Sequence, residues 1–285
     1  MKMHTINNQH KAQNAIFAMH KNDRAMEQAM DRLSTGKRIN SAKDDIGGFV
    51  MASRFEKDIR AAAQGAQNTK HAIALLETVS AAANQAINIL TRMKELAVQA
   101  STDGYTAAQR TTMDTEFQGL VNELTRIDTQ TTWNGTAWMD TVNTATINFG
   151  DATTMDIAFD QWTPNSAGTP ATQAYNTAVF NGTAANDGVT TTANAIAMAA
   201  EIDIALTAAS SEAGKYGSYL NRLNHALDSL KGRELYLSNS LSKIEDADYG
   251  VETAELARTQ IVAQAATAML TQANQSKQTV MTLLQ

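Results

Sequence analysis

The chain carries long heptad repeats near both of its ends and none in its middle. From Tyr216 to Ile244 the intervals between core positions, mostly leucines, alternate between four and three residues. The segment 73–97 keeps the same register. One heptad stripe leaves its apolar face in water unless a second helix covers it. We therefore predict that the N-terminal and C-terminal thirds pack against each other, with the middle of the chain as an insertion at the far end of the bundle.

The leucine run of the C-terminal repeat is the strongest part of this pattern. We assign to the core of an intramolecular bundle the residues Leu220, Leu223, Leu227, Leu230, Leu237 and Leu241. Glu234 occupies a core position in the same run. Either the stripe reaches the surface at this point, or the carboxylate fixes the register of the bundle, as buried polar residues can.

The apolar residues of this chain are mostly small, which constrains how its helices pack. Apolar residues make up 43% of the 285 residues and aromatic residues only 6%, with alanine supplying much of the difference. Alanine-rich stripes suit close approach of helices rather than a bulky globular core. The predicted fold class is mainly α: a long antiparallel helical bundle or coiled coil built from the terminal segments, with a small β-hairpin and a short surface insertion in the middle.

Charge and cysteine content exclude several classes of protein. The net charge is −6 with both signs interspersed, whereas nucleic-acid binding needs a basic face. No cysteine is present, which excludes disulfides and thiolate metal sites. No stretch approaches the roughly 20 apolar residues of a membrane-spanning helix, and residues 1–20 lack the apolar segment of a secretory signal. We expect neither nucleic acid nor membrane as a partner, and export would need another route.

Helical periodicity predicts five helices separated by turns. The expected helices cover residues 3–35, 49–100, 106–128, 194–245 and 250–283. Ser41 followed by Asp44 is typical of a capping box at a helix start, and Asn134-Gly135 is a strong turn signal.

The middle of the chain changes period. Apolar and polar residues alternate on both sides of Gly150, which predicts a β-hairpin at 145–160. Residues 161–193 are rich in Thr, Ala, Asn and Gly and hold both prolines. We expect them to form a solvent-facing segment.

Residues able to carry chemistry do not form a recognisable site. Gly36-Lys37 lacks the preceding glycine and strand of a phosphate-binding loop. The five histidines do not pair at metal-ligand spacing. The acids at 245, 246 and 248 lack the glycine of a calcium loop, so we interpret them as caps of the last helix. We expect no catalytic residue, no metal and no cofactor, and hence no enzyme.

Ordered strings at both ends resemble bacterial flagellins. At the N-terminal end they are RLSTGKRINSAKDD at 32–45, RF at 54–55, DIR at 58–60 and ILTRMKELAVQA at 89–100. At the C-terminal end they are SKIEDADY at 242–249, ET at 252–253, QI at 260–261, QA at 264–265 and MLTQANQ at 269–275. The resemblance covers roughly residues 1–140 and 200–285.

This resemblance implies a structural subunit that polymerises into the helical filament of the bacterial flagellum, for swimming motility. It implies an inner coiled-coil domain at 1–42 and 246–285, and an outer helical domain at 43–245 that includes the hairpin. The middle is short, so the large variable outer domains of longer flagellins are expected to be absent.

The terminal helices carry thin apolar stripes that bury too little to order them alone. We expect these segments to fold on assembly, through contacts with neighbouring copies. The assembly stripes are Ile16, Met19, Met26, Met30, Leu33, Ile261, Ala265 and Met269. The resemblance further implies export in an unfolded state through the flagellar type III apparatus, and an extracellular location in the filament. It also implies an export chaperone, hook-associated proteins and cap proteins as partners.

Flagellins also present a site to the innate receptor Toll-like receptor 5. The residues that match its motif are Arg92, Glu95, Leu96 and Gln99. The sequence departs from the motif at Thr91 and at Lys94, where a second arginine is usual. Lysine keeps the charge but loses the planar fork of arginine.

Two alternatives remain at this point. A hook–filament junction protein of the flagellum is similar at both ends and differs in being present in few copies. A secreted coiled-coil adhesin or effector would have stable helical ends in the dilute monomer.

Overall fold

The computed structural model describes residues 10–140, 142–150, 152–162 and 188–282. Its helices are α1 (His10–Thr35), α2 (Ile46–Ala100), α3 (Ala107–Gln130), α4 (Thr192–Glu245) and α5 (Tyr249–Thr282). Its strands are β1 (Thr132–Trp133), β2 (Thr136–Ala137), β3 (Asn143–Asn148) and β4 (Thr154–Phe159). The prediction of a mainly α chain with a small hairpin is confirmed. The predicted segment 161–193 falls largely outside the described residues, as do residues 3–9 of the first predicted helix.

The helix starts follow local capping chemistry, with one correction. Thr106 caps α3, and Gln109 completes a reciprocal capping box with it. The capping box predicted at Ser41 and Asp44 is wrong, because α2 begins only at Ile46. Instead, one oxygen of Asp44 accepts hydrogen bonds from the amide and the hydroxyl of Ser41, both at 3.0 Å. The short polar side chain therefore stabilises a turn before the helix.

The hairpin predicted at 145–160 is present as the antiparallel pair β3–β4. Residues along β4 alternate strictly between exposed and buried, and its buried residues are Met155, Ile157 and Phe159. Gly150, in the connecting turn, has a φ of 90°, a conformation that glycine adopts without steric cost. One face of the hairpin is therefore available to pack on the helices.

A second, shorter hairpin joins β1 to β2. Asn134 and Gly135, the two turn residues, have φ values of 51° and 79°. Positive φ at both central positions is the requirement of a type I′ turn, so the turn predicted from Asn-Gly is confirmed.

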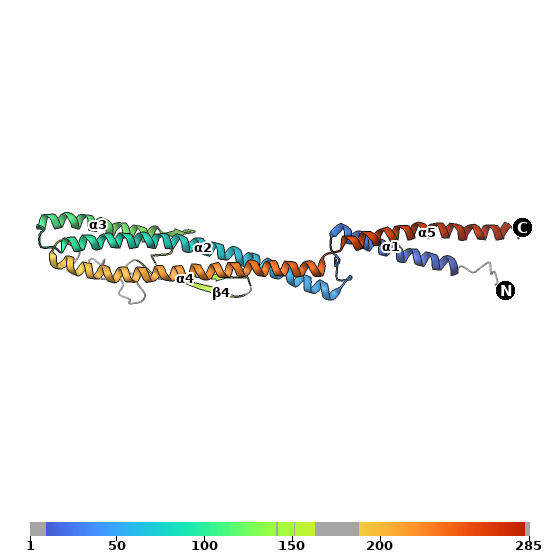
Figure 1. The fold of residues 1–285 in the computed structure, drawn as a ribbon, viewed down its shortest axis with the longest axis horizontal. Coiled ribbons are helices and arrows are strands. Elements are labelled where there is room, and N and C mark those ends of the chain that lie inside the picture. Colours follow the sequence, from blue (N-terminus) through green and yellow to red (C-terminus); the bar gives the residue numbers. More distant parts are fainter. Residues whose placement is uncertain (1–9, 141, 151, 163–187, 283–285) are drawn as a thin grey trace. The chain divides into compact units, whose positions relative to one another are not determined.

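The chain divides into two compact units, at 60–234 and at 1–59 with 235–285. The unit at 60–234 holds the main core, to which α2, α3, α4 and the β3–β4 hairpin contribute (Figure 1). Its largest fully buried side chains include Trp162, Tyr216, Phe117, Phe159 and Leu76. In the other unit α1 lies along α5 (Figure 1).

The boundaries predicted after residue 42 and before residue 246 fall inside the unit that contains both ends of the chain. The division into an inner and an outer domain refers to the assembled state and stays a prediction.

By length and composition alone, α2 and α4 are each apolar enough to cross a membrane. This differs from the sequence expectation, because alanine raises the hydropathy of long windows without forming an unbroken run of large apolar residues. A core helix of a soluble bundle meets the same criterion. In this chain both helices contribute residues to one buried core, which gives their apolar faces an internal partner.

Candidate assembly surface

The contact between α1 and α5 is a narrow seam whose buried residues are small or polar and whose larger apolar residues are only half-buried. On α1 the seam positions repeat at heptad spacing: Met19, Asn22, Met26, Ala29 and Leu33. Ala29 is fully buried, and Asn22 donates a buried hydrogen bond of 2.7 Å to the carbonyl of Thr259 on α5. Short side chains let the two backbones approach, so a side-chain amide of one helix reaches the backbone of the other.

The α5 side of the seam has the same spacing. Its buried or half-buried positions are Glu252, Leu256, Thr259, Ala263, Ala266 and Leu270. The hydroxyl of Thr259 donates to carbonyls of its own helix, at 2.9 Å. Each polar seam residue described above has a hydrogen-bond partner, as burial requires.

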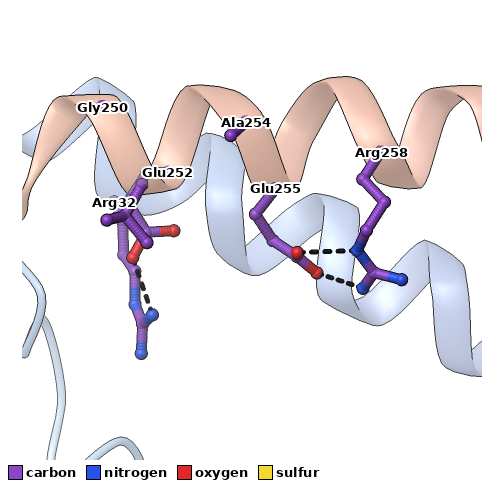
Figure 2. A pocket seen from close by; sticks show the side chains of 7 residues that line it. Arg32, Gly250, Glu252, Ala254, Glu255 and Arg258 are labelled. Atoms are coloured by element: carbon purple, nitrogen blue, oxygen red, sulfur yellow. Dashed lines mark hydrogen bonds and ion pairs between the residues drawn. The ribbon is translucent and has the colours of Figure 1, made fainter.

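An ion pair links the two helices at the end of α1. Arg32 donates to Glu252 at 2.9 Å, and the carboxylate side chain is only 10% exposed (Figure 2). Beside it, Arg258 pairs with Glu255 within α5, with a nitrogen–oxygen distance of 2.8 Å (Figure 2). An open pocket of about 600 Å³ lies among these residues. The charged groups that line the pocket pair with one another, and the pair of Arg32 with Glu252 fixes the register of the two helices. No residue that lines the pocket is a nucleophile beside a base.

The connections at the ends of α1 and α4 are tied together beyond the seam. Lys37 donates to Glu245 at 2.6 Å. This hydrogen bond raises the pKa of Lys37, while its partial burial opposes the shift. The hydroxyl of Tyr249 donates to the carbonyl of Leu33 at 3.1 Å. Three acids were predicted to cap the last helix. Asp248 accepts a hydrogen bond from the amide of Gly250 at 2.8 Å, whereas Glu245 accepts from the ammonium of Lys37.

Large apolar side chains remain in solvent on both helices of the pair. Met30 is 50% exposed, Ile261 66% and Met269 69%. The other exposed apolar side chains of α1 and α5 are Ile16, Phe17, Val251 and Val262. These side chains are candidates for contacts with another molecule.

The residues of the predicted assembly stripes divide between the α1–α5 seam and the solvent-exposed surface. Met19, Met26 and Leu33 are half-buried at seam positions, toward α5. Ile16, Met30, Ile261, Ala265 and Met269 are exposed. Asn22, Glu252 and Thr259 are seam residues that an apolar pattern does not reveal, because they are polar. The heptad spacing of small and polar residues on α5 was the available signal.

The predicted bundle-core leucines differ in burial. Leu223 is fully buried and Leu230 nearly so. Half-buried positions are Leu220, Leu227, Leu237 and Leu241, and Glu234 is half-buried as well. The stripe is thus deepest near Leu223.

The residues predicted to meet a receptor lie near the end of α2. Arg92 bonds to Glu116 at 2.8 Å and to Glu95 at 3.0 Å, and all three are exposed. The amide of Gln99 donates to the hydroxyl of Tyr105 at 3.1 Å. Leu96 is only 2% exposed and belongs to the bundle core.

Within the described residues, no three His, Cys, Asp or Glu side chains are arranged to hold a metal ion. The geometry defines a class of protein: an α-helical protein whose two terminal helices pair and leave large apolar side chains in solvent. Residues 6–144 match the bacterial flagellin N-terminal helical region, and residues 199–284 match the bacterial flagellin C-terminal helical region. The chain belongs to the bacterial flagellin family, whose members are structural proteins of the flagellar filament.

Full-length relatives agree with this assignment. A flagellin of Halalkalibacterium halodurans is 34% identical over 98% of this chain and 99% of its own length. A flagellin of Bacillus subtilis is 30% identical over 98% of this chain and 99% of its own length. A solved structure assigned as a flagellar hook-associated protein from Vibrio parahaemolyticus has a TM-score of 0.58. It is 15% identical and covers 71% of this chain and 100% of its own chain, a likeness that concerns the fold alone. The matches along the whole chain favour a filament subunit over a junction protein or an adhesin.

Proposed function

We propose that this flagellin polymerises through the apolar side chains that α1 and α5 leave in solvent. The observation that carries the proposal is the exposure of Met30, Ile261 and Met269 beside a seam whose buried residues are small or polar. Burying one such side chain between copies contributes about 1.5–3 kcal/mol. Several per subunit would drive association, and the heterologous contact would extend into an open helical filament.

The inner domain of the filament would consist of residues 1–42 and 246–285, with 43–245 as the outer domain. The seam supports this assignment because it buries few large side chains. A pair of helices held in this way gains little against the entropy of ordering, so its folding would be completed by neighbouring copies.

Export and chaperoning follow from the same weakness. A chain without cysteines and with weakly stabilised ends can pass an export channel unfolded and fold outside the cell. We propose the flagellar type III apparatus as the route and an export chaperone that covers the apolar face of α5. Hook-associated and cap proteins would meet the ends of the filament.

Recognition by Toll-like receptor 5 would use the exposed side chains of Arg92, Glu95 and Gln99. Leu96 would support this surface from inside the core. Lys94 forms an ion pair with Asp203, and Lys94→Arg is expected to raise signalling in reporter cells that express the receptor. Unchanged signalling would remove Lys94 from the contact.

Seeded polymerisation tests the assembly surface. Ile261→Asp places a charge on the exposed apolar face of α5, and we expect it to abolish elongation from filament seeds. Gln260→Asp is the matched control, because it adds the same charge at the neighbouring exposed polar position. Elongation by Ile261→Asp at the wild-type rate would contradict the proposed surface. Equal loss in both variants would assign the effect to charge rather than to the apolar contact.

A further inference from the structure

Methionine is the only sulfur-containing residue type in this chain. The sequence has 13 methionines and no cysteine. Thioether sulfur is therefore the side-chain group most open to two-electron oxidation by peroxides, which convert methionine into methionine sulfoxide. Because an oxidant must reach the sulfur, the burial of each methionine decides which of them react first.

Burial separates the methionines of the two compact units. In the unit at 60–234 every described methionine is buried or half-buried: Met93, Met113, Met139, Met155 and Met198. The exposed methionines among the described residues all lie in the unit that contains both chain ends: Met30, Met51 and Met269. A peroxide should therefore reach the terminal unit first and spare the main core.

Two of the exposed methionines lie on the paired helices α1 and α5. Met30 is 50% exposed and lies two residues before Arg32, which forms the ion pair across the seam. Met269 is 69% exposed and lies ten residues beyond Thr259, whose carbonyl accepts the buried hydrogen bond of the seam. At about 1.5 Å per residue, this is about 15 Å along α5. Both methionines point away from the seam, so their oxidation leaves the seam hydrogen bonds in place.

Oxidation would change the polarity of these side chains and leave their size almost unchanged. A lone pair of the sulfur attacks one oxygen of hydrogen peroxide, an S–O bond forms, and the O–O bond breaks. The hydroxide that leaves takes up a proton and becomes water, so sulfur loses two electrons and the peroxide gains them. The product is a polar sulfoxide. Burying a polar group without a hydrogen-bond partner is unfavourable, whereas burying the thioether is favourable.

We propose that Met30 and Met269 are oxidation sites that control assembly: a subunit with both thioethers adds to the filament, and a subunit with sulfoxides does not. This inference rests on the proposed function, because it takes a second copy of the chain as the molecule that covers both side chains. Free subunits are then sensitive to peroxide, whereas subunits inside a filament are protected. Methionine sulfoxide reductases, which return both sulfoxide epimers to the thioether, reverse the effect.

Peptide mass spectrometry after treatment with hydrogen peroxide tests the two sites. In free subunits Met30, Met51 and Met269 should gain oxygen before the fully buried Met93 and Met139 do. In preformed filaments the oxidation of Met30 and Met269 should be much slower than in free subunits. Equal oxidation rates at these two residues in both states overturn the proposal.

Seeded growth measures the consequence. For each sulfoxide, the concentration of free subunit in equilibrium with filaments should rise on the order of tenfold to a hundredfold, as expected for a buried polar group without a partner. Treatment with methionine sulfoxide reductases should restore the original concentration. Normal growth of subunits oxidised at Met30 and Met269, or a loss of growth that persists after reduction, overturns the proposal.

The combined variant Met30→Leu with Met269→Leu keeps both side chains apolar and of similar volume and removes both sulfur atoms. Its growth should be the same before and after peroxide. Met51→Leu is the matched control, because Met51 is exposed to the same 50% as Met30 and lies outside the two paired helices. It should stay as sensitive as the wild type, and resistance equal to that of the combined variant overturns the proposal. Should the combined variant fail to polymerise before treatment, the reductase experiment on the wild type decides.

Ile261→Asp, without peroxide, distinguishes this inference from the proposed function. Normal growth of Ile261→Asp contradicts the assembly surface itself. Loss of growth in Ile261→Asp together with normal growth of the oxidised wild type refutes only the role of the two methionines.

Discussion

Replacing Gly65 by alanine should destabilise the unit at 60–234, although the same change normally stabilises a helix. Gly65 lies inside α2, and a Cβ atom there would lie 2.2 Å from the carbonyl oxygen of Phe149. A Cβ atom on Gly150 would lie 2.1 Å from the carbonyl oxygen of Ala61. The turn of the β3–β4 hairpin therefore rests on the backbone of α2, and neither contact leaves room for a methyl group.

The size of the effect follows from two opposing contributions. Alanine in place of glycine within a helix stabilises it by about 0.5–1 kcal/mol. Overpacking costs about 1–3 kcal/mol, occasionally more, and here the obstacle is backbone rather than a mobile side chain. Displacing the hairpin would also strain the 2.9 Å hydrogen bond from Asn68 to the carbonyl of Asn148, worth about 1 kcal/mol. We expect a net loss of about 2 kcal/mol, and a fall in melting temperature of about 4–8 °C for a unit of this size.

Urea unfolding of the monomer, followed by circular dichroism, measures this loss. Gly119→Ala and Gly214→Ala are the controls, because a Cβ atom at either helical position has no neighbour within 4 Å. Both should gain about 0.5–1 kcal/mol. If Gly65→Ala gains stability as the controls do, the hairpin does not rest on α2 as described.

Three further substitutions test the core, the titration and the seam. Leu223→Ala empties a fully buried position and should cost about 2–5 kcal/mol in unfolding free energy, whereas Leu235→Ala, at a position 60% exposed, should change it by less than about 0.5 kcal/mol. The folded pKa of Asp128 is raised by burial and by the nearby Asp140, so the wild-type unfolding free energy should fall as the pH rises from about 4 to about 8. Asp128→Asn should remove this dependence, which amounts to at most about 5 kcal/mol. Glu252→Gln removes the ion pair across the seam and should lower the temperature at which filaments depolymerise, whereas Glu255→Gln, at a pair within α5, should leave it unchanged.

Most of the fold could be predicted from the spacing of apolar residues in the sequence, because the helices are long and their repeats are regular. The alternation around Gly150 was enough to place the hairpin. Sequence alone could not show that Gly65 admits the hairpin turn, since that contact joins residues about 80 positions apart. It also misplaced the role of Asp44, because the same spacing of polar residues serves either a helix cap or a turn before the helix.

The assembly surface was predictable only in part. Large apolar residues such as Ile261 and Met269 stand out in the sequence, but the pattern does not say whether they face α1 or solvent. The α5 side of the seam includes Glu252 and Thr259. These two polar residues can be buried because Arg32 and Asn22 of α1 form hydrogen bonds with them. Polar residues at buried positions can be predicted only when the partner helix and its register are known.

The division between seam and exterior explains how one pair of helices can be specific and yet depend on assembly. Asn22, Thr259 and Glu252 hold α1 and α5 through directional hydrogen bonds, which fix register but contribute only about 0.5–1.5 kcal/mol each, and somewhat more for a charged pair. The large apolar side chains of the seam, such as Met26 and Leu33, are only half-buried, and others lie outside it, at Met30 and Met269. A monomer with this arrangement selects the right partner helix without burying enough surface to hold it firmly. The remaining stabilisation would then come from neighbouring copies, so ordering of the ends and growth of the filament become one event.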